Sequence, residues 1–150
     1  MVTIKMKRNV KLPVDKSILL RAAQVVMELA AAADTSDLSI VIGDDALLQK
    51  LNLKYRHLDE PTDVLSFPSG EIDPDTSGLY LGDIVISLPR AQDQASTEGH
   101  LLADELQLLV VHGILHLMGY DHGEIKDKKL MQTAQDNSLN QLGLNLSNTL

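Results

Sequence analysis

The chain of 150 residues contains no cysteine and no tryptophan, one phenylalanine and three tyrosines. The absence of cysteine excludes disulfide bonds and metal sites that use thiolate ligands. Only histidine and carboxylate side chains are therefore left to hold a metal ion. The chain also lacks an apolar run long enough to cross a bilayer, and residues 1–16 contain no continuous apolar stretch typical of a secretory signal. We therefore expect a cytoplasmic protein with no membrane association.

Acidic residues outnumber basic ones, and the formal net charge is −8. This balance argues against nucleic-acid binding, because contacts to phosphate depend on lysine and arginine. The charge is uneven, since residues 1–21 hold six basic groups and one acidic group, a net charge of +5, and the remainder carries −13. A basic end could contact RNA, but a solvated strand and helix face is the simpler interpretation. Charge alone does not identify the partner.

Apolar residues in strand-like patterns predict four strands, within residues 2–10, 38–43, 63–68 and 79–87. Helical patterns occupy residues 13–34, 46–56, 89–100, 101–119 and 123–143, and the expected N-caps are Asp15 or Ser17 and Asp44 or Asp45. The stretch 69–78, SGEIDPDTSG, is rich in turn-forming residues and predicts a loop or hairpin connection. Residues 144–150 are expected to fray.

The order of these elements favours one α+β domain over residues 1–150, because no linker or repeat divides the chain. We expect a small mixed β-sheet of about four strands with helices packed on it. The helix in 101–119 is apolar on almost every side between Leu106 and Met118, which predicts that it is buried. A metal site is expected at the C-terminal end of this buried helix.

The metal site is predicted from HGILHLMGYDH, which places His112, His116 and His122 at the ligand spacing of metzincin zinc peptidases. Residues i and i+4 of a helix lie on one face, so the first two imidazoles can reach one metal ion. Gly119 stands where a helix end often needs a left-handed residue, so the chain can reverse and return His122 as a third ligand. Three protein ligands leave a position for water, which is typical of catalytic rather than structural zinc.

Gly113 occupies the position at which such peptidases carry their catalytic glutamate. Glycine cannot accept a proton from metal-bound water, so peptide hydrolysis by that route is disfavoured. Glycine in a helix interior also costs about 1 kcal/mol relative to alanine. We therefore expect another group to approach the backbone closely at this position. A metal ion here could still polarise a phosphoryl oxygen.

Arg56 comes at the end of a predicted helix, just before a turn that contains proline. The planar guanidinium could grip a phosphate group through paired hydrogen bonds. A cation at a helix C-terminus is also favoured by the helix dipole. On the residues alone, the second interpretation is the simpler one.

Three stretches in this order resemble the YbeY family of rRNA maturation factors: YRHLDEPTDVLSFP, LGDIVIS and GHLLADELQLLVVHGILHLMGYDH. The specific motifs run from Leu51 to His122, whereas residues 1–50 agree mainly in the order of strand and helix. Members of that family are described as single-strand-specific, metal-dependent endoribonucleases. They act in the 3′-end maturation of small-subunit (16S) rRNA and in ribosome quality control.

The resemblance implies that His112, His116 and His122 bind one zinc ion per chain and that Arg56, His112 and His116 are catalytic. It favours the phosphate-binding interpretation of Arg56, and it makes Gly113 a family feature. It also implies single-stranded RNA and small-subunit rRNA as substrates, with the small ribosomal subunit and its proteins as partners in ribosome biogenesis. No cofactor other than the metal ion is expected.

Two alternatives stay open. A non-catalytic ribosome-assembly factor with a structural zinc is favoured by the four aromatic residues, which offer few stacking platforms for bases. A metallopeptidase-like zinc hydrolase keeps the ligand spacing but lacks the base. The general base is not identified, and either water or the RNA 2′-hydroxyl can be the nucleophile.

Several polar residues near the motifs have both a structural and a functional interpretation: Asp63, Ser66, His100, Asp121 and Glu124. His57 is expected to be exposed. Glu105 shares the helix face of His112 but lies about 10 Å away along the axis, too far to act as a base on the metal.

Overall fold

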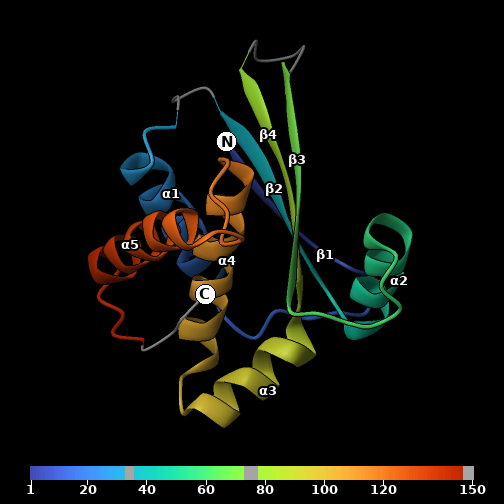
Figure 1. Cartoon of the computed structure of the whole chain (residues 1–150). Coiled ribbons are helices and arrows are strands. Elements are labelled where there is room, and N and C mark those ends of the chain that lie inside the picture. Colours follow the sequence, from blue (N-terminus) through green and yellow to red (C-terminus); the bar gives the residue numbers. More distant parts are fainter. Residues whose placement is uncertain (33–35, 73–77, 147–150) are drawn as a thin grey trace.

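The computed structural model describes residues 1–32, 36–72 and 78–146 (Figure 1). Four strands form one sheet in the order β1-β2-β4-β3. They are β1 (Val2–Met6), β2 (Asp37–Gly43), β3 (Val64–Ile72) and β4 (Leu79–Ser87). The pairs β1–β2 and β2–β4 are parallel, whereas β3 runs antiparallel to β4 at the edge of the sheet. The predicted α+β fold with a mixed sheet of four strands is confirmed.

Five helices accompany the sheet within the described ranges: α1 (Lys16–Leu29), α2 (Asp45–Arg56), α3 (Leu88–Glu98), α4 (Leu102–Leu117) and α5 (Ile125–Gln141). The first two begin at expected caps, because the side chains of Asp15 and Asp44 accept hydrogen bonds from the first turns of α1 and α2. None of these helices combines the length and the apolar character that a membrane span needs.

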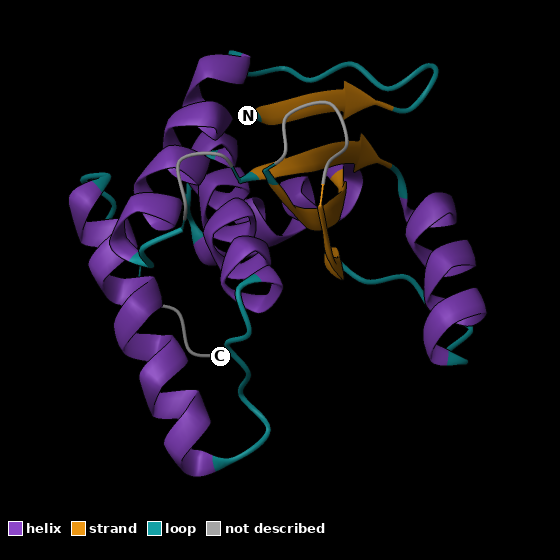
Figure 2. Cartoon of the chain, turned by 90° about the horizontal axis from the view of Figure 1, so that it is seen from above, coloured by secondary structure: helices purple, strands orange, loops and turns teal. Residues whose placement is uncertain are grey.

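The helices cover the sheet unequally (Figures 1 and 2). One face packs against α4, which lies between the sheet and α1 and α5, whereas α2 packs on the opposite face. Side chains alternate between the faces along each strand. In β4, for example, Ile84 faces the core around α4, and Val85 joins Leu48 of α2 in a smaller cluster.

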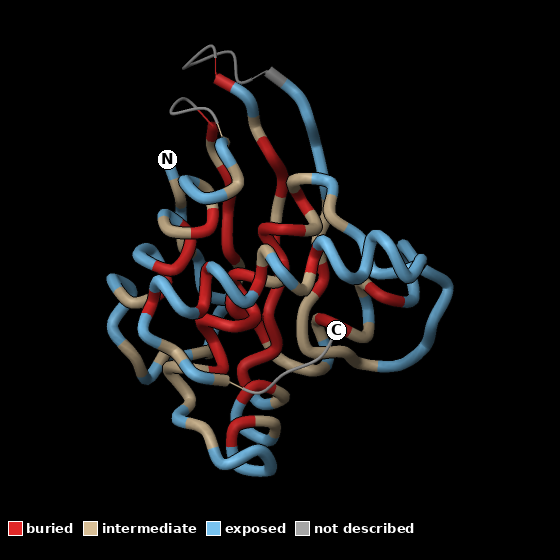
Figure 3. The backbone as a smooth tube through the Cα atoms, turned by 60° about the vertical axis from the view of Figure 1, so that its left-hand side comes forward, coloured by how far each residue is buried: buried red, intermediate tan, exposed pale blue. Residues whose placement is uncertain are grey.

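Helix α4 is buried along most of its length, as the sequence predicts (Figure 3). It lies at the centre of the main apolar core, between the sheet on one side and α1, α3 and α5 on the others. Residues on this helix therefore have fixed positions relative to the sheet.

The antiparallel pairing of β3 with β4 fits the predicted loop or hairpin connection over 69–78, but β3 continues to Ile72, so the predicted start of the connection is too early. Turn-forming residues fit here because β3 is an edge strand, where proline and irregular pairing are tolerated. The pairing of β3 with β4 shifts register between Pro68 and Glu71, and this irregularity holds Ser69 and Gly70. Residues 73–77 of the predicted loop, and 147–150 of the predicted frayed end, lie outside the described residues.

Candidate metal centre

The end of α4 brings the three histidines of the motif together. The helix closes with two hydrogen bonds, from the Tyr120 N–H to the Leu115 carbonyl at 3.0 Å and from the Gly119 N–H to the His116 carbonyl at 3.1 Å. This closing pattern needs a left-handed residue, and Gly119 supplies it with φ +96°. The chain reverses there and brings His122 back beside α4, as the sequence predicts.

The three imidazoles form one cluster. Each of His112, His116 and His122 offers a ring nitrogen, and these atoms all lie within 4.8 Å of one another. Within the part of the chain that the structure describes, this is the cluster that could hold a metal ion. The predicted convergence is therefore found, whereas the role of the three residues as ligands stays a prediction.

Hydrogen bonds set the orientation of two of these rings. The Nδ1 atom of His116 lies 3.0 Å from the carbonyl oxygen of Tyr120. A carbonyl only accepts, so Nδ1 of the neutral ring donates and Nε2 keeps its lone pair. The Nδ1 atom of His112 lies 3.0 Å from Oε1 of Gln135 on α5, which has the same consequence.

Burial also favours the neutral form of these two rings. It lowers the pKa of His112 and of His116 below the ordinary value of 6.5. Neutral imidazole is the form that binds metal ions. His122 is the exposed member of the cluster. The donor set of three imidazoles, with two oriented by hydrogen bonds, fits a divalent metal such as zinc.

Gly113 allows the sheet to approach α4 closely. A Cβ atom at this position would lie 3.0 Å from Cγ2 and 3.1 Å from Cδ1 of Ile84 on β4, closer than ordinary packing allows. The hydroxyl of Ser66 on β3 donates to the Gly113 carbonyl at 3.0 Å. The close approach that the sequence predicts at this glycine is confirmed.

The histidines line an open cavity of about 440 Å³ at the edge of the sheet. Its other walls come from α2, β3, the turn before β3 and the loop after α4: Arg56, Thr62, Asp63, Val64, Ser66, Pro68 and Asp121. Arg56 is exposed and forms no ion pair with any residue that the structure describes, so its guanidinium can bind an anion. The structure thus brings Arg56 and the histidines, which come from opposite faces of the sheet, to one cavity.

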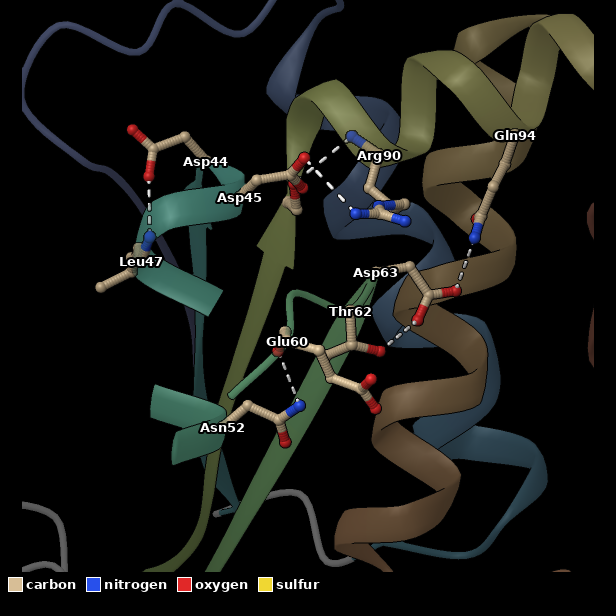
Figure 4. Close-up of polar contacts among 10 residues, drawn as sticks. Asp44, Asp45, Leu47, Asn52, Glu60, Thr62, Asp63, Arg90 and Gln94 are labelled. Carbon is tan, nitrogen blue, oxygen red and sulfur yellow. Dashed lines mark hydrogen bonds and ion pairs between the residues drawn. The ribbon is translucent and has the colours of Figure 1, made fainter. Parts of the chain in front are cut away.

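The end of α2 fixes the position of Arg56. His57 follows in the left-handed conformation with φ +60° and ends the helix. The buried Asn52 then donates from its side-chain amide to the carbonyl of Glu60 at 2.9 Å, which ties the next loop back to α2 (Figure 4). His57 itself is exposed, as expected.

Two carboxylates stand in the cavity wall. Oδ1 of Asp63 accepts from the Val64 N–H at 2.7 Å. Its Oδ2 accepts from the Gln94 side chain at 3.2 Å (Figure 4). Asp121 accepts from the N–H of His122 at 2.7 Å. Both carboxylates thus have structural partners and also line the cavity, whereas a functional role for either stays a prediction.

The structure separates other candidates from the cavity. His100, Glu105 and Glu124 do not line it, and Glu124 instead precedes α5 as its N-cap residue. Thr62 lines the cavity, and Gln135 supports the site through its hydrogen bond with His112. Neither residue is predicted from the sequence. For Gln135 a signal existed, because a polar residue four positions after Met131 falls on the buried face of α5.

Comparisons with known proteins agree with this geometry. The family model described as Endoribonuclease YbeY matches residues 3–143. A protein of Pelotomaculum thermopropionicum named Endoribonuclease YbeY is 43% identical over 140 residues, which cover 89% of this chain and 92% of that protein. One of the same name from Roseiflexus sp. is 42% identical over 137 residues, 87% of this chain and 86% of the relative.

A solved structure is similar as well. The solution structure of TM1509 from Thermotoga maritima shares 27% identity with a TM-score of 0.62, over 95% of this chain and 89% of that one. The match of the family model and the identity to these relatives extend over most of the chain. The chain therefore belongs to the YbeY family of endoribonucleases.

Proposed function

We propose that this chain, as one domain over residues 1–150, is a zinc-dependent endoribonuclease that cleaves single-stranded RNA. The observation that carries the proposal is the shared cavity, which is lined by Arg56 and by the cluster of His112, His116 and His122. The relatives are named endoribonucleases, which gives RNA as the substrate class.

The three histidines would hold one zinc ion per chain. Three imidazoles also suit nickel and copper, so the choice of zinc rests on the open arrangement that three-ligand catalytic zinc sites share. When bound, the metal supplies Lewis acidity and lowers the pKa of a coordinated water. The remaining steps depend on groups of the chain itself.

Arg56 is proposed to bind the scissile phosphate. Its planar fork of donors matches two phosphate oxygens, and it has no carboxylate partner among the described residues that would compete. A fixed cation here offsets the negative charge that gathers on the phosphoryl oxygens in the transition state. The hydrogen bond from Asn52 to Glu60 ties the loop after Arg56 back to α2.

Asp63 and Asp121 are the carboxylates available to accept the proton of the nucleophile. Asp63 is held through both of its oxygens, so its position in the cavity is fixed. Asp121 lines the cavity and accepts a hydrogen bond from one backbone N–H, that of His122. His112 and His116 act by holding the metal beside these groups.

The biological setting that we propose is the maturation of 16S rRNA at its 3′ end and ribosome quality control, in the cytoplasm. The net charge of −8 gives the chain little affinity of its own for RNA. Proteins of the small ribosomal subunit are therefore proposed as partners that bring the substrate to the cavity. The alternative, an assembly factor with structural zinc, predicts the same partners and no cleavage.

Cleavage of a single-stranded RNA and of the matching duplex by nuclease-free protein tests the proposal. Wild type is expected to cut the single strand and to lose activity when a chelator removes the metal. Arg56→Ala should lower the rate by about 10²-fold or more, in the range found when a group that stabilises transition-state charge is removed. Arg21→Ala, an exposed arginine of α1 outside the cavity, is the matched control. Equal rates for Arg56→Ala and wild type would contradict the role of Arg56.

A further inference from the structure

Gln135 is a polar residue in an apolar setting. It lies on the face of α5 that packs against α4, and its side chain is 1% exposed. A buried amide is costly unless it is hydrogen-bonded. Its Oε1 atom lies 3.0 Å from Nδ1 of His112, and this contact accounts for the presence of a glutamine in the core.

We propose that Gln135 is a positioning residue of the metal centre. By accepting from Nδ1–H, it holds the neutral ring of His112 in the tautomer whose Nε2 lone pair faces the other two histidines. The Tyr120 carbonyl does the same for His116, so two of the three rings are oriented from outside the cavity. Helix α5 lines no part of the cavity, yet it becomes part of the centre through this contact.

The tautomer can be read without metal or RNA, from nitrogen–proton correlations of the imidazole rings in the metal-free protein. Wild type is expected to show His112 protonated on Nδ1. Gln135→Met keeps the volume but removes the acceptor, so His112 should lose its single tautomer. Zinc affinity, measured by competition with a chromophoric chelator, should fall about 10-fold to 100-fold.

Two further variants separate positioning from packing. Gln135→Glu retains an acceptor and should keep the tautomer and bind zinc at least as tightly as wild type. Gln107→Met changes another buried glutamine, which bonds Ala103 within α4 and touches no histidine, and it should leave both readouts unchanged. Wild-type zinc affinity in Gln135→Met, or His112 protonated on Nε2 in wild type, would overturn the proposal. Failure of RNA cleavage in all variants would count against the proposed function alone.

A second observation concerns the aromatic residues. Tyr55 and Phe67 form an edge-to-face pair with ring centroids 5.2 Å apart. Phe67 packs on the small apolar cluster between α2 and the sheet, so the pair has a fixed base. Tyr55 is 55% exposed, and Nζ of Lys54 lies 5.1 Å from the centre of its ring. Half of the few aromatic residues thus gather at one place.

The two aromatic residues are chain neighbours of residues that line the cavity. Tyr55 precedes Arg56 in the chain, and Phe67 stands between Ser66 and Pro68. Arg56, Ser66 and Pro68 all line the cavity. Alternation along β3 turns Phe67 to the face opposite these two neighbours. Phe67 lies on the edge strand of the sheet, as its cavity-lining neighbours Ser66 and Pro68 do.

The geometry points to Tyr55 as a stacking platform for a nucleobase, an assignment that rests on the proposed function. Exposed aromatic rings beside cations are the usual means of binding single-stranded RNA without reading its sequence. A strand whose phosphate contacts Arg56 would place a neighbouring base over Tyr55, with Lys54 near the next phosphate.

Anisotropy of a labelled single-stranded oligonucleotide, together with KM and kcat for its cleavage, tests this subsite. Tyr55→Ala should weaken binding and raise KM about tenfold, whereas Tyr55→Phe should stay near wild type because the ring is kept. Leu53→Ala removes another exposed apolar residue of α2 and should change neither value. Unchanged binding by Tyr55→Ala, or equal losses in Tyr55→Ala and Leu53→Ala, would overturn the assignment. Binding without any cleavage by wild type would count against the proposed function instead.

Discussion

The hydroxyl of Ser66 donates to the carbonyl of Gly113 at 3.0 Å, and this bond joins the edge strand β3 to α4 directly beside His112. Ser66 lines the cavity together with Arg56, and Gly113 belongs to the helix that carries two of the histidines. The contact therefore joins two walls of the cavity, the edge strand and the histidine-bearing helix.

Removal of this hydroxyl should destabilise the fold. Ser66→Ala removes the hydroxyl that donates to the Gly113 carbonyl. We therefore expect a loss of about 1 kcal/mol in the free energy of unfolding. Urea denaturation of the metal-free protein measures it. Ser96→Ala, at an exposed position of α3, is the control and should change stability little. Equal stabilities of the two variants would show that the bond contributes nothing.

Gly113→Ala tests the close approach of Ile84. Helix propensity alone would stabilise the variant by about 1 kcal/mol. The new Cβ would meet the Ile84 side chain at 3.0 Å, and such overpacking costs about 1–3 kcal/mol. We expect net destabilisation, and a smaller cost in an Ile84→Val background, which removes one of the crowding carbons. A stabilising Gly113→Ala, or strictly additive effects in the double variant, would contradict the packing account.

Glu105 should make stability depend on pH. Burial raises the pKa of its carboxyl above 4.5; nearby His100 opposes this rise, and Asp63 and Glu98 add to it. Above pH 4.5 the unfolded chain releases this proton while the folded chain keeps it, so this group lowers stability as pH rises through the raised pKa. Glu105→Gln removes the effect, so its stability relative to wild type should increase with pH.

Unfolding curves at several pH values from 4 upward measure this difference. Glu71→Gln, at an exposed position of β3, serves as the control and should follow wild type. A constant difference between Glu105→Gln and wild type across the range would show that Glu105 ionises normally in the fold.

Zinc should stabilise the folded chain through the histidine cluster. A ligand at a hundred times its dissociation constant adds about 2.7 kcal/mol when it binds only the folded state. The melting temperature of wild type should therefore rise with zinc, and His122→Ala should lose most of that rise. His57→Ala changes an exposed histidine outside the cluster and should respond as wild type does. A similar rise in His122→Ala would place the stabilising zinc elsewhere.

Much of the fold could be predicted because local patterns and packing agree. The apolar helix around Leu106–Met118 is buried, and the caps Asp15 and Asp44 are used as expected. The sequence predicts the connection to begin at Ser69, because Ser69 and Gly70 are turn-forming residues, whereas β3 continues to Ile72. An edge strand tolerates them, but edge position follows from strand order, which no local pattern reveals.

The candidate site was predictable in its ligand motif, because spacing on one helix and a turn glycine fix the three histidines locally. The residues that support the site could not be predicted from the sequence. Gln135 reaches His112 only because α5 packs on α4, and Thr62 joins the wall only because the loop after α2 returns to β3. The shared cavity of Arg56 and the histidines likewise depends on how α2 and α4 cover opposite faces of the sheet.

The most direct test of the metal centre measures zinc content and cleavage of a single-stranded RNA on the same nuclease-free preparations. Wild type and His116→Ala are compared, with His100→Ala as a control outside the cavity. We expect about one zinc ion per chain in wild type and in the control, as for a single three-ligand catalytic site. Both zinc and cleavage should be lost in His116→Ala. Bound zinc without cleavage in wild type, or full cleavage by His116→Ala, would contradict a catalytic centre.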